Sequence, residues 1–149
     1  LQPLAETASG GEMSRFLLAL KACFSQVDPV GTLVFDEIDV GVSGRVAQAI
    51  AEKLYQLGRQ HQVLCVTHQP MVAALADAHF RVGKHVVEAA GAKGAKTDEA
   101  ERTVVRVLPL SMGDRREELA QLAGGESHQQ SLSFAESLLS QADSLRDKL

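Results

Sequence analysis

The chain has 149 residues, of which 45% are hydrophobic and 23% charged, and its formal net charge is −4. This length and composition suffice for one domain with a real core, which excludes a disordered segment and a small disulfide scaffold. The negative balance supplies no field that would by itself attract nucleic acid or an anionic membrane. No apolar run approaches the roughly 20 residues that span a bilayer, so we expect a single soluble domain over residues 1–149.

The first predicted element is a helix that follows Ser9-Gly10-Gly11-Glu12. Apolar residues recur after this motif with the period of a helix, namely Phe16, Leu17, Leu20, Cys23, Phe24 and Val27. Ser-x-x-Glu is also a capping box, which is the ordinary start of a helix. Two glycines in a first turn cost roughly 1 kcal/mol each relative to alanine. The second interpretation is therefore that the glycines, which lack a Cβ, let an anion approach the backbone closely. It predicts a phosphate site at the positive end of the helix dipole.

Residues 32–35 predict a short buried strand, and two acids follow it directly. A carboxylate at the carboxyl end of a parallel strand lies where open α/β sheets bind their ligands. There Asp36 would hold a magnesium ion through water, and Glu37 would orient or deprotonate an attacking water. Asp39 adds a third carboxylate, and such crowding repels unless a cation or a donor group lies nearby, which favours a metal site. A pair of solvated acids in a loop is the alternative interpretation.

Residues 46–57 and 62–67 complete a βαβ unit. The first segment has helical periodicity, and the second is apolar enough for another buried strand. A helix that links two short apolar strands predicts a parallel pair. Because neighbouring parallel strands end on the same edge of the sheet, we expect His68 to lie beside Asp36 and Glu37 and to hydrogen-bond a phosphate.

The rest of the chain predicts further strands and helices around this unit. We expect a short helix over 70–77, a strand over 79–87, an edge strand over 103–110, and helices over about 113–123 and 128–147 that are separated by Gly124-Gly125. Residues 89–101 predict a flexible loop. Cys23 and Cys65 lie in apolar runs, which predicts buried thiols in a reducing cytoplasm. The fold class is α/β, with a largely parallel sheet flanked by helices.

The sequence contains no loop of the form Gly-x-x-x-x-Gly-Lys-Ser/Thr to cradle phosphates. In its closest run, residues 90–97, alanine stands at both glycine positions. The histidines other than His68 show no metal-ligand spacing, and two separated cysteines argue against a zinc site.

Four motifs stand in an order that resembles the head of an ABC-type ATPase. AlaSerGlyGlyGlu, ThrLeuValPheAspGluIleAsp, the turn at 40–44 and ValThrHisGlnPro resemble the signature motif, Walker B, D-loop and switch histidine. Within this superfamily the chain is most similar to the RecN family, SMC-like bacterial ATPases of DNA double-strand-break repair. The tail ArgArgGluGluLeuAlaGlnLeuAlaGlyGly carries this closer resemblance. The chain would be the C-terminal lobe of such a head, without the N-terminal Walker A lobe and the coiled coil.

The resemblance implies a role for each motif. The signature residues would contact the γ-phosphate of ATP held by the opposite head, and they are Ser9, Gly10, Gly11 and Glu12. Asp36 would position Mg²⁺, Glu37 would be the catalytic base, and His68 would sense the γ-phosphate. The loop that meets the partner head would contain Asp39 and Ser43.

The implied function is ATP hydrolysis by the whole protein in DNA repair and recombination, driven by dimerisation of two heads. ATP and Mg²⁺ would be its cofactors, and its partners would be the Walker A lobe of the same protein, a second head in a homodimer, and DNA by resemblance only. Its location would be the bacterial cytoplasm, at the nucleoid, and the chain alone would be inactive. Two alternatives stay open: a head lobe of another SMC-like ATPase, and a non-enzymatic α/β interaction module.

Overall fold

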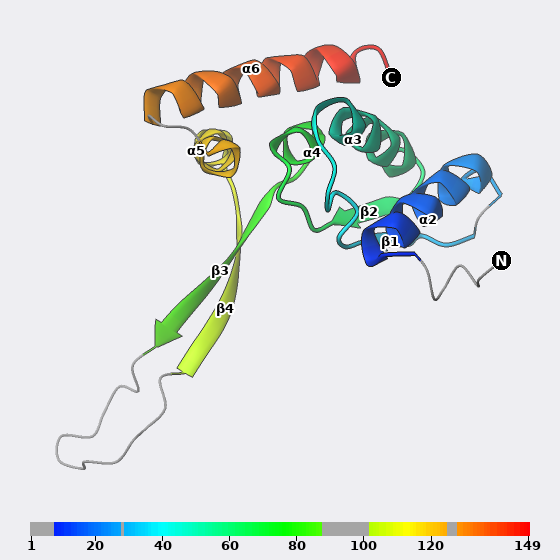
Figure 1. Ribbon diagram of the computed structural model, residues 1–149, viewed down its shortest axis with the longest axis horizontal. Coiled ribbons are helices and arrows are strands. Elements are labelled where there is room, and N and C mark those ends of the chain that lie inside the picture. The colour runs from blue at the N-terminus through cyan, green and yellow to red at the C-terminus, as the bar shows by residue number, and fades with distance from the viewer. Residues whose placement is uncertain (1–7, 28, 88–101, 125–127) are drawn as a thin grey trace.

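The computed structural model describes residues 8–27, 29–87, 102–124 and 128–149, and within them the chain forms five helices and two small sheets (Figure 1). The fold class is α/β, as predicted. The predicted loop over 89–101, together with Asp28 and Gly125, lies outside the described residues. Among the described helices, none combines the length and the apolarity that crossing a bilayer requires.

Helix α2 (Gly10–Phe24) begins with the predicted capping box. The Ser9 hydroxyl accepts a hydrogen bond from the Glu12 amide, and the Ser9 amide donates to Glu12 Oε2 at 2.9 Å. Each group thereby satisfies a polar atom that the start of a helix leaves without a helical partner. The Ser9 amide and the Ser9 hydroxyl both donate to the Glu12 carboxylate, and these bonds hold the pKa of Glu12 below its usual range.

The predicted βαβ unit is present. Strand β1 (Thr32–Phe35) pairs in parallel with β2 (Gln62–Cys65), and helix α3 (Gly44–Gly58) connects them. The buried side of α3 shares a core with the inward side chains of β1, namely Leu33 and Phe35. The apolar period of this segment therefore predicts both its conformation and its buried face.

The opposite face of the parallel pair is apolar and uncovered. Val34 is 64% exposed, Leu64 49% and Val66 63%. Parallel sheets ordinarily carry cover on both faces, because their crossovers place helices there. This face therefore has the composition of a buried surface without a partner among the described residues.

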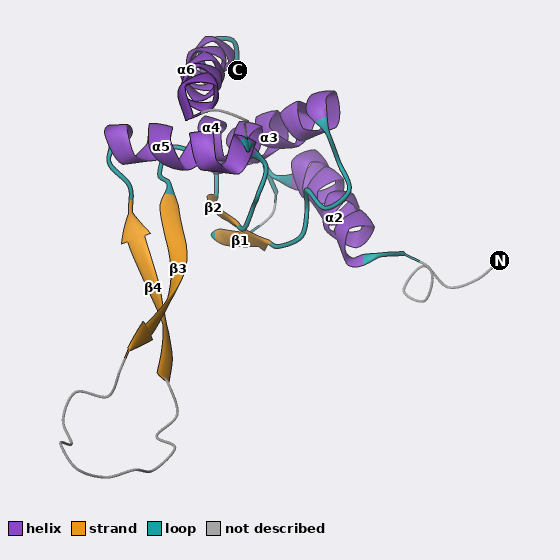
Figure 2. Ribbon diagram, turned by 60° about the vertical axis from the view of Figure 1, so that its left-hand side comes forward, coloured by secondary structure: helices purple, strands orange, loops and turns teal. Residues whose placement is uncertain are grey.

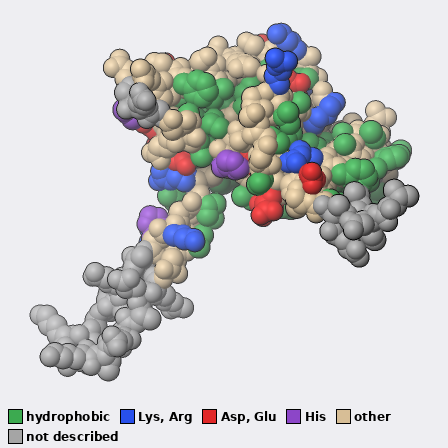
Figure 3. All heavy atoms as spheres, in the orientation of Figure 1, with side chains coloured by type: hydrophobic (Ala, Val, Ile, Leu, Met, Phe, Trp, Pro, Cys, Tyr) green, Lys and Arg blue, Asp and Glu red, His purple; other side chains and the backbone are tan. Residues whose placement is uncertain are grey.

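The apolar side of α2 is uncovered as well, which corrects the prediction that Cys23 is a buried thiol. Phe16 and Phe24 are more than half exposed, Cys23 is exposed, and Leu18 is the one large apolar side chain of α2 that is buried. Hydrophobic side chains gather over this helix in Figure 3. Periodicity shows which side of a helix is apolar, but whether that side is covered depends on what packs against it.

Strands β3 (Phe80–Val87) and β4 (Arg102–Pro109) form an antiparallel hairpin that projects away from the helices (Figures 1 and 2). The sequence predicts both strands, with the second at a sheet edge. Their pairing differs from a continuous, largely parallel sheet, because they form a sheet of their own, with Phe80 opposite Pro109. Alternation identifies strands without specifying their partners.

Helices α4 (Pro70–Leu75), α5 (Met112–Ala123) and α6 (His128–Arg146) complete the core. Two arginines from α5 and α6 meet at the carboxyl end of α4. Arg115 Nη2 donates to the carbonyls of Ala73 at 3.0 Å, Ala74 at 2.8 Å and Ala76, and Arg146 Nη2 donates to Ala76 at 2.9 Å. Burial and the neighbouring Arg146 lower the pKa of Arg115. These bonds satisfy carbonyls that the end of a helix leaves unpaired.

Candidate functional site

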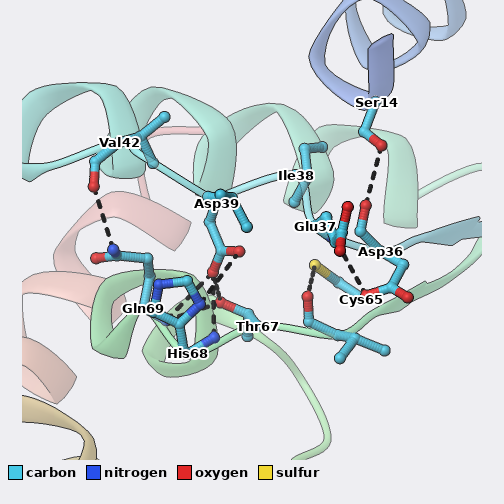
Figure 4. A network of polar contacts seen from close by, with 12 residues as sticks. Ser14, Asp36, Glu37, Ile38, Asp39, Val42, Cys65, Thr67, His68 and Gln69 are labelled. Atoms are coloured by element: carbon cyan, nitrogen blue, oxygen red, sulfur yellow. Dashed lines mark hydrogen bonds and ion pairs between the residues drawn. The ribbon is translucent and has the colours of Figure 1, made fainter. Parts of the chain in front are cut away.

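The loop at residues 36–40 is the centre of the candidate site. It follows β1 at the carboxyl edge of the parallel pair, where the predicted ligand site should lie. Two other motifs contact it. The start of α2 packs against it from one side, and the loop at residues 67–69 packs against it from the other (Figure 4).

Asp36 and Glu37 lie on the α2 side of this loop. Both are exposed, and Asp36 Oδ1 accepts a hydrogen bond from the Glu37 amide at 2.9 Å. Glu37 has a φ of +57°, a left-handed conformation that is unfavourable for a residue with a side chain. Its carboxylate lies over the start of α2, where a Cβ built on Gly10 would be 2.7 Å from Glu37 Oε2.

Helix α2 contacts the loop through two hydrogen-bonding side chains and one closely packed glycine. The Ser14 hydroxyl donates to the Asp36 carbonyl at 2.9 Å, and Arg15 Nη1 donates to the carbonyls of Ile38 at 3.2 Å and Val40 at 3.1 Å. A Cβ on Gly11 would lie 2.9 Å from the Glu37 carbonyl oxygen, closer than real contacts allow. The sequence predicts close approach of an anion as the reason for this glycine, and the structure adds close approach of the chain's own loop.

Asp39 points away from the other two acids, toward the 67–69 loop. It is 1% exposed and accepts hydrogen bonds from the Thr67 hydroxyl and, at 3.2 Å each, from the amides of His68 and Gln69. His68 Nδ1 lies 3.6 Å from Asp39 Oδ1. The carboxylate is thus engaged inside the chain, and the place of Asp39 in a loop that meets a partner head stays a prediction.

The contacts of Asp39 bear on the prediction that three crowded carboxylates need a cation or a donor group nearby. Its charge is met by a hydroxyl and two amides, and within the described residues no group of three or more His, Cys, Asp or Glu side chains could hold a metal ion. Asp36 keeps one carboxylate oxygen outside the hydrogen bond to Glu37. A single exposed carboxylate of this kind is enough for Mg²⁺, which retains several waters and takes further ligands from phosphate.

His68 and Ser43 are the other predicted site residues, and both are exposed. The His68 ring is 62% exposed. At this sheet edge the ring lies next to Asp39, whereas the sequence predicts that it lies beside Asp36 and Glu37. Ser43 precedes α3 as its N-cap but makes no side-chain capping bond. Its hydroxyl therefore remains at the surface, as a residue that meets a partner requires.

Sequence reasoning missed the residues that join these motifs. They are Ser14 and Arg15 on α2, and Thr67 and Gln69 beside the histidine; Gln69 Nε2 donates to the Val42 carbonyl at 3.2 Å. Helical spacing could have indicated the first two, because they lie three and four residues after Gly11 and so share its face. Thr67 and Gln69 carried no signal beyond their place next to His68.

Cys65 ends β2 next to this site and is chemically quiet. Burial, followed by the negative charges of Asp39 and Asp36, raises the pKa of its thiol to about 12. The thiolate is the reactive form of cysteine, so this side chain is not a nucleophile at neutral pH.

Comparison with solved structures defines the class of this lobe. A chain from structural work on ATP-driven dimerization and DNA stimulated activation of SMC ATPases matches it with a TM-score of 0.52. The match covers 82% of this chain and 66% of that chain at 20% identity, so the likeness is one of fold. The fold is that of an SMC-type ATPase head lobe.

Comparison of sequences gives the family. DNA repair protein RecN of Synechocystis sp. (strain ATCC 27184 / PCC 6803 / Kazusa) is 63% identical over 98% of this chain, and RecN of Bacillus subtilis (strain 168) is 43% identical over 98%. No family model matches the chain. The chain belongs to the RecN family, and it spans about a quarter of the length of these curated relatives, 26% and 23%.

Proposed function

We propose that the chain is the C-terminal lobe of the ATPase head of a RecN-family protein that acts in DNA repair and recombination. The observation that carries the proposal is the 36–40 loop, which gathers the signature, Walker B and switch motifs at the carboxyl edge of a parallel pair. A ligand edge built from these side chains suits the phosphates of ATP. The whole protein would act on DNA in the bacterial cytoplasm, at the nucleoid.

The rest of the same protein is the first proposed partner. The exposed face of the parallel pair carries Val34, Leu64 and Val66, and it needs cover to make a stable sheet. The matched relatives are about four times as long as this chain. A lobe with the phosphate-cradling Walker A loop would supply both the cover and the missing half of the site.

The exposed acids and histidine would carry the chemistry of ATP hydrolysis. Asp36 would hold Mg²⁺ through water, and the bound ion would neutralise charge on the phosphates. Glu37 would accept the proton of the attacking water. Among the described residues, none donates a hydrogen bond to its carboxylate. His68 would contact the γ-phosphate through Nε2, because its Nδ1 faces Asp39. Nε2 would donate when the ring is protonated, since both ring nitrogens then carry a proton.

The start of α2 would serve the ATP of a second head. Ser9, Gly10 and Glu12 are exposed at the positive end of the helix, whereas Gly11 is buried against the loop. Gly11 would therefore contribute by letting α2 approach the loop, and its neighbours would meet the γ-phosphate. Ser43 would contact the second head, so that two heads enclose two ATP molecules in a homodimer.

The test uses the whole protein and its size in solution with ATP. Glu37→Gln should abolish hydrolysis, retain ATP and trap a dimer, while Ser9→Arg should block the dimer and spare nucleotide binding to one head. Unchanged hydrolysis in Glu37→Gln would remove the base assignment.

Residues 1–149 alone should show no ATPase activity above background, and robust turnover by them would contradict the proposal.

A non-enzymatic module is the competing interpretation, and two variants separate it from an ATPase lobe. Asp36→Ala and His68→Ala should each reduce ATP hydrolysis by the whole protein. If both leave ATP-dependent activity untouched, the capping box and the acids are structural, and the module is the better description.

A further inference from the structure

We propose that Asp39 is a positioning residue that fixes the 67–69 loop and orients the His68 imidazole for ATP hydrolysis. The inference rests on the proposed function and assigns this carboxylate a task inside its own head. It would act through His68.

The first support is the burial of the carboxylate and the way its charge is met. Asp39 is 1% exposed, and a buried charge without partners is strongly unfavourable. Three donors converge on its Oδ2: the Thr67 hydroxyl and the amides of His68 and Gln69 at 3.2 Å each. Hydrogen bonds to an ionised acceptor are the stronger kind, so these three specify one conformation of the 67–69 backbone.

The second support is the other oxygen, Oδ1. His68 Nδ1 lies 3.6 Å from it, while the ring itself is 62% exposed. Asp39 therefore accepts a hydrogen bond from the His68 backbone amide and lies within ion-pair distance of one ring nitrogen when the ring is protonated. A carboxylate that faces one nitrogen of an imidazole sets the direction and the proton position of the other. With Nδ1 facing the carboxylate, Nε2 is the ring nitrogen left for a ligand, and it can donate to a phosphate when the ring is protonated.

The third support is the position of the two segments that the Asp39–His68 contact joins. Asp39 belongs to the 36–40 loop, to which Arg15 of α2 donates hydrogen bonds. At the other end of the contact, α4 starts immediately after Gln69. A shift of the 36–40 loop would therefore move the carboxylate that orients His68. The inference predicts that the acid affects the rate of hydrolysis and leaves the binding of nucleotide largely intact.

The experiment is a double-mutant cycle on ATP hydrolysis by the whole protein. Asp39→Asn keeps the shape and an acceptor oxygen but loses the charge that faces Nδ1. We expect kcat to fall about tenfold, as for other residues that orient a functional histidine, with KM for ATP changed less than about twofold. In a His68→Ala background the same substitution should change kcat by less than about twofold, because no imidazole remains to be oriented. Asp147→Asn, an exposed aspartate after α6, is the matched control and should leave kcat unchanged.

Three results would overturn the inference. An equal loss of kcat in both backgrounds would mean that Asp39 only supports the fold. Unchanged hydrolysis in Asp39→Asn would mean that His68 needs no orienting acid. Loss of the ATP-dependent dimer, with hydrolysis reduced only in proportion, would place Asp39 at the partner interface. In each case the wild-type ATPase activity stands, whereas a wild-type protein that hydrolyses no ATP would refute the proposed function and this inference together.

Discussion

Helices α2 and α3 each contain 15 residues, and each follows the apolar period of an amphipathic helix, yet their surroundings differ. Helix α3 buries Ala47, Ile50, Ala51, Leu54 and Leu57. Helix α2 buries Gly11 and Leu18, and its other large apolar side chains are exposed. The pattern of a sequence therefore specifies a helix and its apolar face, while the residues that cover this face can belong to another part of the protein.

The largest expected effect concerns the covered helix. Leu54→Ala on α3 should lower the free energy of unfolding by about 2–5 kcal/mol, because it removes buried atoms and leaves a cavity. Leu20→Ala on α2 is the matched control; its side chain is 44% exposed, and its loss should change the stability of residues 1–149 by less than about 0.5 kcal/mol. Urea unfolding measures both. Equal losses would show that α2 is packed as tightly as α3.

The next effect concerns the contact of α2 with the 36–40 loop. Gly11→Ala places a Cβ 2.9 Å from a backbone oxygen, and overpacking of this kind costs about 1–3 kcal/mol, partly offset by up to about 1 kcal/mol of better helix propensity. Gly10→Ala meets only the flexible end of Glu37 and should be close to neutral. Thermal unfolding of the two variants compares them. A Gly11→Ala protein as stable as Gly10→Ala would show that the loop gives way easily.

The smallest perturbation is chemical and leaves the sequence unchanged. In residues 1–149 at pH 8, a maleimide should modify the exposed Cys23 much faster than Cys65, which is partly buried and has a pKa of about 12. The rate at Cys65 should rise with pH toward that value, because the thiolate fraction grows. In the whole protein Cys23 should be protected if another part of the protein covers the apolar side of α2. Equal modification of Cys23 in both forms would contradict that cover.

Local patterns predicted much of this fold. The capping box at Ser9, the parallel pairing of β1 with β2 and the helix between them follow from residue types and spacing, and the structure confirms them. The left-handed Gly124 that ends α5, with a φ of +58°, confirms the predicted C-cap. These features depend on a few neighbouring residues, which is why a single sequence suffices for them.

Long-range choices could not be predicted in the same way. The hairpin of β3 and β4 could have joined the parallel pair, because strand patterns do not name a partner. Asp39 belongs to the same acidic stretch as Asp36, but its direction depends on Thr67, 28 residues later. The roles proposed for the other site residues stay predictions, and they come from motif order and resemblance.

The arginines at the end of α4 have a consequence for the order in which the chain folds during synthesis. The carbonyl of Ala74 receives Arg115 from 41 residues later, and that of Ala76 receives Arg146 from 70 residues later. At synthesis rates of about 5–20 residues per second, these partners leave the ribosome about 2–8 s and about 4–14 s after α4 does. The helix that begins beside His68 therefore acquires its first end caps when α5 has been made and its last when α6 has been made.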